Sequence, residues 1–130
     1  MKKLFIATAA IFAASSVYAA PETVCAAPTT AGDGTQITTT YGFTAAASGT
    51  AGFVINNFTP KCSANVYAAI EQSEISLAAS AGSKKGKNMF SGSTNGGGVK
   101  PNGTSYANGV SEAQVKTEAT AALAAGAGSN

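Results

Sequence analysis

The residues best suited to contact a ligand are three lysines in one short segment. Lys84, Lys85 and Lys87 lie within Gly-Ser-Lys-Lys-Gly-Lys-Asn, residues 82–88. The segment differs from the phosphate-loop motif G-x-x-x-x-G-K-[ST], because its glycines are one residue closer and Asn follows its last lysine. The lysines predict a solvated hairpin loop at 80–87 that protects a sheet edge. Alternatively, they form a positive contact for a polysaccharide or another anionic surface.

The chain has two cysteines, Cys25 and Cys62. In an oxidising compartment such a pair predicts a disulfide. Closing a loop of this length stabilises the folded state by roughly 4 kcal/mol in the chain-entropy treatment. A metal site or a reactive thiol is the alternative, and the lack of histidine and of a C-x-x-C motif disfavours both.

Catalytic groups are scarce. Without histidine the chain cannot build a Ser-His-Asp or Cys-His arrangement. Asp33 is the only aspartate, which excludes an EF-hand-like calcium loop. Glu71 and Glu74 are interpreted as solvated turn residues rather than a glycosidase pair. The sequence therefore predicts no enzyme activity, metal or cofactor.

Residues 1–19 have the pattern of a signal peptide. Lys2 and Lys3 precede an apolar run from Leu4 to Ala14, and Val-Tyr-Ala at 17–19 predicts cleavage after Ala19, with Ala20 as the alternative. The apolar run is shorter than the ~20 residues that span a bilayer. We expect a secreted, periplasmic or cell-surface protein of a Gram-negative bacterium that does not span the membrane after cleavage.

The formal charge of +2 depends on Lys2 and Lys3, because the other six lysines balance six acidic residues. The exported chain is therefore nearly neutral, and its basic sequence pI does not indicate nucleic-acid binding. Near-zero charge removes the repulsion that keeps copies apart. Self-association, or association with other envelope proteins, is the expected kind of partnership.

The elements that position these residues are mainly β. We expect a small antiparallel sheet or sandwich with one disulfide, in which residues 20–92 form the β core and 93–109 form a Gly/Asn-rich loop. Alternating apolar residues predict strands at 35–44, 62–70 and 74–79, the last with Ile75 and Leu77 pointing inward, and apolar residues on both faces predict a strand at 50–58. A short strand or an extended arm at 20–27 precedes them. Residues 52–70 are predicted as the central hairpin. Tight turns are predicted at Asp33-Gly34 and at 71–73.

The alanine-rich segment 110–130 predicts a short helix. Ser111 and Gln114 have the spacing of a capping box, and Val110 and Val115 have that of a hydrophobic staple. Gly126 is the expected C-terminal cap. A frayed strand through 115–121 is the alternative.

These features predict an exported structural or assembly subunit of the cell surface or extracellular matrix, pilin-like or fibre-forming. Cys25 and the apolar segment from Phe53 to Cys62 resemble the first bridged cysteine and apolar strand of chaperone–usher pilins. The arm before Cys25 is shorter than a donor strand, and the C-terminus is Ala/Gly-rich rather than an alternating strand, so no family is assigned. The alternative is a small periplasmic or secreted binding module for a glycan or anionic ligand, acting through the Lys84–Lys87 loop.

Overall fold

The computed structural model describes residues 20–26, 32–34, 53–54, 56–96 and 98–127. The predicted signal peptide and the predicted strand at 35–44 lie outside this part of the chain. The described elements are β1 (Glu22–Ala26), β2 (Gly32–Asp33), β3 (Lys61–Cys62), β4 (Val66–Gln72), β5 (Leu77–Ser83), β6 (Met89–Ser93), β7 (Lys100–Pro101) and α1 (Glu112–Ala127). The prediction of a mainly β fold with a C-terminal helix is confirmed.

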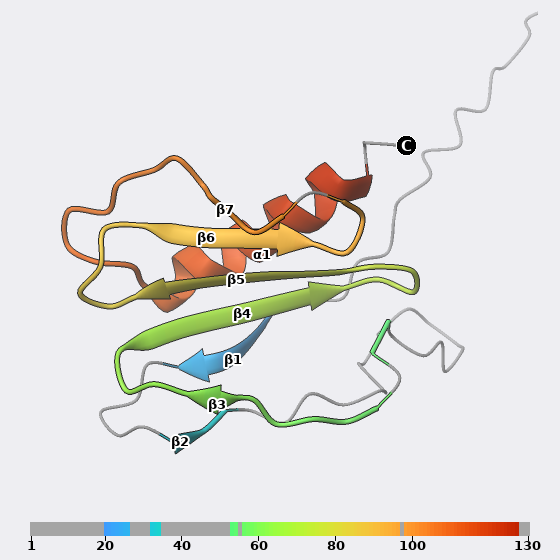
Figure 1. Cartoon of the computed structure of the whole chain (residues 1–130), viewed down its shortest axis with the longest axis horizontal. Coiled ribbons are helices and arrows are strands. Elements are labelled where there is room, and N and C mark those ends of the chain that lie inside the picture. Colours follow the sequence, from blue (N-terminus) through green and yellow to red (C-terminus); the bar gives the residue numbers. More distant parts are fainter. Residues whose placement is uncertain (1–19, 27–31, 35–52, 55, 97, 128–130) are drawn as a thin grey trace, which may run out of the picture.

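Five of the strands form one antiparallel sheet in the order β1-β4-β5-β6-β7. The central pair is β4 and β5, whose register runs from Val66 opposite Ser83 to Gln72 opposite Leu77. Strands β2 and β3 form a separate two-stranded ribbon. Figure 1 shows this ribbon beyond β1, at the opposite side of the sheet from β6 and β7.

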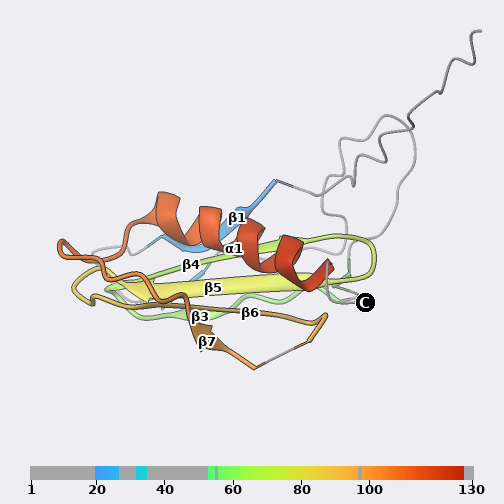
Figure 2. The same cartoon turned by 90° about the horizontal axis from the view of Figure 1, so that it is seen from above.

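Helix α1 lies along one face of the sheet (Figure 2) and packs against β4, β5 and β6. Successive side chains of a strand point to opposite faces, so alternate residues of these strands meet the helix. The resulting apolar layer is continuous and almost fully buried. It contains Ala69, Met89, Val110, Val115 and Ala119, with Tyr67 and Tyr106 packed beside them.

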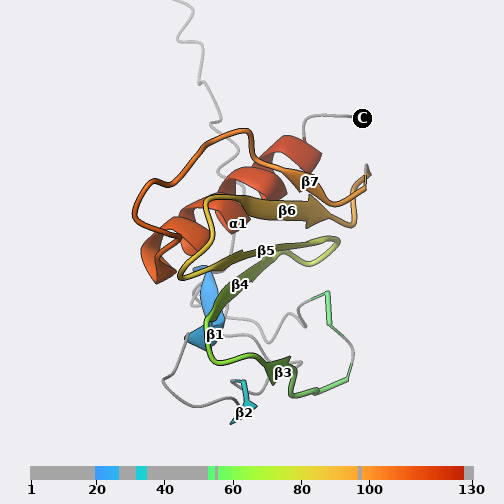
Figure 3. The ribbon, with the colours of Figure 1, turned by 60° about the vertical axis from the view of Figure 1, so that its left-hand side comes forward.

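A second apolar cluster lies on the other side of β4, where the disulfide is found. Cys25 of β1 and Cys62 of β3 are bridged, with their Cα atoms 5.7 Å apart. Both are buried beside Val24 and Ile70, and Val54, Ala68 and Leu77 pack against this group. The predicted disulfide is confirmed, and it joins the edge strand β1 to the β2–β3 ribbon. Figure 3 shows the course of these three strands.

The predicted central hairpin at 52–70 is wrong. Phe53, Val54 and 56–58 contain no strand beyond a single bridge at Phe58. The amide of Phe53 donates to the Ser73 carbonyl and that of Val54 to the Gln72 side chain, so neither joins a strand ladder. The central hairpin is instead β4–β5.

Several predicted strand limits are also wrong, because local hydrogen bonds place the turns elsewhere. A turn at 64–65 separates β3 from β4, and β4 continues through Glu71 and Gln72. The β4–β5 turn is held by Ser73, whose amide donates to the Ser76 carbonyl and whose Oγ accepts from the Ser76 amide. Ile75, expected to point inward, lies at this turn and is 80% exposed.

Two further corrections concern Asp33 and the expected loop at 80–87. Asp33 is paired with Lys61 in the β2–β3 ribbon rather than placed in a tight turn. Strand β5 continues to Ser83, so the loop begins only at Lys84.

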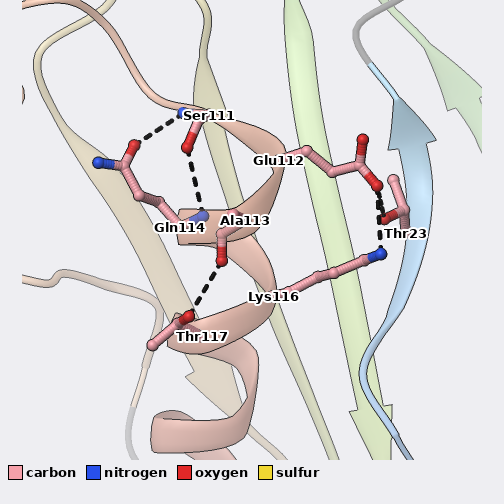
Figure 4. Close-up of polar contacts among 7 residues, drawn as sticks. All are labelled: Thr23, Ser111, Glu112, Ala113, Gln114, Lys116 and Thr117. Atoms are coloured by element: carbon pink, nitrogen blue, oxygen red, sulfur yellow. Dashed lines mark hydrogen bonds and ion pairs between the residues drawn. The ribbon is translucent and has the colours of Figure 1, made fainter.

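The start of α1 is confirmed as a capping box. The Ser111 amide donates to Gln114 Oε1 over 2.8 Å, and the Gln114 amide donates to Ser111 Oγ over 3.4 Å (Figure 4). Val110 and Val115 are both buried in the same cluster, as the hydrophobic staple requires. The alternative strand is wrong, and so is the expected cap at Gly126, because α1 continues to Ala127.

Replacing Ser111 with alanine is expected to lower the free energy of unfolding by about 1 kcal/mol, because an amide of the first helical turn loses its acceptor. Ser105→Ala is the control, since Ser105 is exposed in the loop before the helix. Urea unfolding followed by circular dichroism measures both. Equal effects from the two changes would contradict a capping role for Ser111.

Candidate functional site

The three lysines proposed as ligand contacts lie together in the β5–β6 turn. Lys84, Lys85 and Lys87 are all exposed between Ser83, the last residue of β5, and Met89, the first of β6. We call residues 84–88 the lysine tip. It joins two inner strands of the sheet and therefore does not protect a sheet edge, contrary to the sequence interpretation. The edge beside β6 is instead β7, whose two residues are Lys100 and Pro101.

The backbone of the lysine tip is fixed from two directions. The Lys84 amide donates to the Asn65 carbonyl over 2.8 Å, and the Tyr106 amide donates to the Lys87 carbonyl over 2.9 Å. Gly109, at φ +82°, passes so close that a Cβ there would overlap the Lys84 carbonyl oxygen. The tip therefore presents its ammonium groups from an ordered backbone, which lowers the entropy cost of binding an anion.

A small polar cluster joins the first turns of α1 to β1 (Figure 4). The Thr23 hydroxyl donates to Glu112 Oε1 over 2.6 Å, and Lys116 Nζ lies 3.2 Å from the same oxygen. The Thr23 hydrogen bond, with the help of Lys116, holds the pKa of Glu112 below its ordinary value. Burial raises the pKa of the neighbouring Glu22.

These two shifts act on stability with opposite signs. Glu112 stabilises the fold above its unfolded pKa, and this contribution is lost as the pH falls through its lowered folded pKa. Glu22, with a raised pKa, favours the fold at low pH, and its contribution is lost as the pH rises through its folded pKa. The hydrogen bond between Thr23 and Glu112 connects the helix to the edge strand, so we assign this cluster a structural role.

Thr23→Val is expected to raise the pKa of Glu112 toward its ordinary value, because the hydroxyl that stabilises the carboxylate is removed. The measurement is an NMR titration of the side-chain carboxyl carbon. Thr117→Val is the matched control, since the Thr117 hydroxyl donates to the Ala113 carbonyl and not to Glu112. A Glu112 pKa that is the same in wild type and Thr23→Val would contradict the assignment.

Two other glutamates, one on β4 and one on α1 itself, connect the helix to the rest of the fold. Glu71, predicted to be solvated, is 3% exposed and accepts a hydrogen bond from Thr120, because β4 places it on the helix face. Glu118 accepts from Ser91 Oγ at 2.6 Å and from Asn102 Nδ2 at 3.1 Å, and Asn102 also donates to the Tyr106 hydroxyl. A cavity of about 210 Å³ adjoins Glu118 and Tyr106. Both carboxylates have partners within the protein, so they hold the helix on the sheet.

The side chains of β5 and β6 that point away from α1 form an uncharged surface. We call it the open sheet face, and it consists of Leu77, Ala79, Ala81, Phe90 and Gly92, together with Val99, which packs over Gly92. Phe90 is 46% exposed and Val99 is 76% exposed. Neither β5 (Leu-Ala-Ala-Ser-Ala-Gly-Ser) nor β6 (Met-Phe-Ser-Gly-Ser) has a charged residue.

Sequence analysis did not identify the open sheet face. Its signal is the period-two spacing of Leu77, Ala79 and Ala81, followed by Phe90 and Gly92. Alanine and glycine contribute little to the hydrophobicity of a segment. The spacing therefore predicted a strand at 74–79 and did not indicate an exposed apolar surface.

The chain matches no known protein family, no curated protein and no solved structure. Among the described residues, no helix is long and apolar enough to cross a membrane. The same part of the chain contains no group of three or more His, Cys, Asp or Glu residues placed to hold a metal ion.

Proposed function

We propose that the protein is an exported structural subunit of the cell surface or extracellular matrix of a Gram-negative bacterium. It acts by associating with copies of itself or with other envelope proteins, and it performs no catalysis. The observation that carries the proposal is the open sheet face, an exposed apolar surface without charge in a chain whose first residues resemble a signal peptide. Soluble proteins seldom expose contiguous apolar surface unless it meets a partner.

Two further features support this role. The disulfide between Cys25 and Cys62 suits an oxidising compartment, where it protects a small domain against unfolding. The balanced charge of the chain without Lys2 and Lys3 lets copies approach one another without net repulsion.

Shearing intact cells tests the proposal. The released fraction is expected to contain the protein in assemblies far larger than one chain, visible as filaments or aggregates by negative-stain electron microscopy. Recovery of the protein only as a monomer in the periplasmic fraction would contradict the structural role.

The lysine tip supports a second candidate, a secreted or periplasmic module that binds an anionic glycan. Its three ammonium groups are exposed on a hydrogen-bonded backbone, as an electrostatic contact requires. Binding to an acidic polysaccharide such as alginate is measured by the shift of the melting temperature. Lys85→Gln with Lys87→Gln should abolish the shift, whereas the matched charge change Lys61→Gln with Lys100→Gln should leave it. Equal losses would mean that only net charge matters.

A further inference from the structure

We propose that two copies of this chain associate face to face through their open sheet faces, related by a twofold axis that lies in the interface and runs parallel to the two sheets. The inference rests on the proposed function and deepens it, because it names the surface and the first partner, a second copy. Its physical basis is the shape and charge of the β5–β6 region.

The open sheet face has projections and hollows on the same surface. Phe90 adjoins a hollow of about 380 Å³ that Val66, Ala81 and Ser83 also line, with Lys87 of the lysine tip at one side. A second hollow, of about 230 Å³, is lined by Leu77, Ala79, Gly92, Thr94 and Val99. The small side chain of Ala79 leaves room above the sheet beside Val99, which covers Gly92. A second sheet packs on such a surface at about 10 Å.

This arrangement is complementary to itself. A twofold axis midway between Phe90 and the second hollow places the Phe90 ring of each copy in the hollow beside Ala79 of the other. In such an isologous contact both copies use the same surface, so the contact between the Phe90 ring and the hollow is made twice. A large side chain facing small ones is also the pattern by which packed layers interdigitate.

Charge favours a second copy over an anionic polymer at this surface. The side chains of the open sheet face carry no charge, and the hollow beside Ala79 has no charged lining. An anion would be drawn instead to the lysine tip, whose Lys87 adjoins only the hollow beside Phe90. A second copy presents the same uncharged surface and leaves no charge buried without a partner.

The area of the face sets the expected strength. Strand β5 has 7 residues and β6 has 5, so two strands about 20 Å long, each about 4.8 Å wide, cover roughly 200 Å². A stable interface buries about 800 Å² per partner, so this contact belongs to the weak, concentration-dependent class. Many copies held close together on a cell surface would strengthen it through effective concentration.

Sedimentation equilibrium of the exported protein, with its disulfide intact, tests the proposal from about 10 μM to about 1 mM, the range of weak dissociation constants. The wild type is expected to show a monomer–dimer equilibrium. Phe90→Ser should raise the dissociation constant at least about tenfold, because it removes an aromatic anchor. Phe58→Ser is the matched control, since Phe58 is also aromatic and 48% exposed but precedes β3, and it should leave the constant unchanged.

A second variant covers the case in which Phe90→Ser misfolds. Ala79→Lys introduces an ammonium group at an exposed position in the smaller hollow and should also abolish association, with an unchanged circular dichroism spectrum. If the wild type associates and both variants associate equally well, the surface is wrong while the proposed function stands. A strictly monomeric wild type overturns the pairing, and the shearing experiment then judges the proposed function separately. If the wild type is monomeric and Phe90→Ser strongly lowers its free energy of unfolding, other residues of the same chain cover the face, and the proposed pairing is wrong.

Discussion

Replacing Cys25 and Cys62 together with serine is expected to lower the free energy of unfolding by about 4 kcal/mol. The bridge closes a loop across a sequence separation of 37 residues, and in the chain-entropy treatment its removal returns that freedom to the unfolded chain. Small domains are stabilised by only about 5–10 kcal/mol. The variant should therefore unfold at a much lower temperature than the wild type.

The position of the bridge strengthens this expectation. Cys62 belongs to β3, whose only strand partner among the described residues is the two-residue strand β2. Cys25 belongs to β1, the edge strand of the main sheet. Without the covalent link, the ribbon keeps only noncovalent contacts to the sheet, chiefly those of the apolar cluster around Val24 and Ile70.

Guanidinium unfolding followed by circular dichroism, with and without dithiothreitol, measures the effect. Reductant should shift the wild-type midpoint to that of the double serine variant and leave the variant unchanged. The slope of free energy against denaturant should rise on reduction, because an unbridged chain exposes more surface when it unfolds. A shift of less than about 1 kcal/mol would mean that the unfolded chain is already compact around this loop.

The sequence predicted the fold where local chemistry decides it. The disulfide was predicted because the chain contains two cysteines, so Cys25 could pair only with Cys62 within one chain. The helix start was predicted because Ser111 and Gln114 satisfy one another within a single turn, independently of the rest of the chain.

The strand predictions were wrong where packing overrides local preference. The segment around Phe53 and Val54 has high β propensity, yet its amides bond to the β4–β5 turn. Strand β5 has low β propensity, since it contains Ala, Ser and Gly, but small residues are what a closely packed helix requires. A Cβ at Gly82 would lie within 3 Å of the Val110 side chain, and the Ser80 hydroxyl donates to the Val115 carbonyl of α1. No local pattern shows that a helix more than thirty residues later will cover this strand.

Of the two candidate contact surfaces, one could be predicted from the sequence and the other could not. The lysine tip was found from sequence because its charge is visible in the residue types. The open sheet face was not found, because its exposure depends on which side of the sheet α1 covers, and only the three-dimensional arrangement fixes that side.

Met89→Ala is expected to lower the free energy of unfolding by about 2–5 kcal/mol, the range for truncating a large side chain in a packed core. Met89 is 1% exposed and belongs to the layer between the sheet and α1, with Val115 and Ala119. The surrounding strands and helix are held by the main sheet and by the hydrogen bonds of Glu118, so they cannot close fully around the missing atoms. The cost should therefore include a cavity as well as lost burial.

Phe90→Ala is the matched comparison, because Phe90 is the next residue of β6 and points to the opposite face. It is larger than Met89, yet it is 46% exposed, so its truncation should cost the monomer less than about 1.5 kcal/mol. Urea unfolding at low micromolar protein measures both variants while association contributes nothing to stability. Equal costs would show that Phe90 is as well packed as Met89 within one chain, and the open sheet face would then have no exposed anchor to offer a second copy.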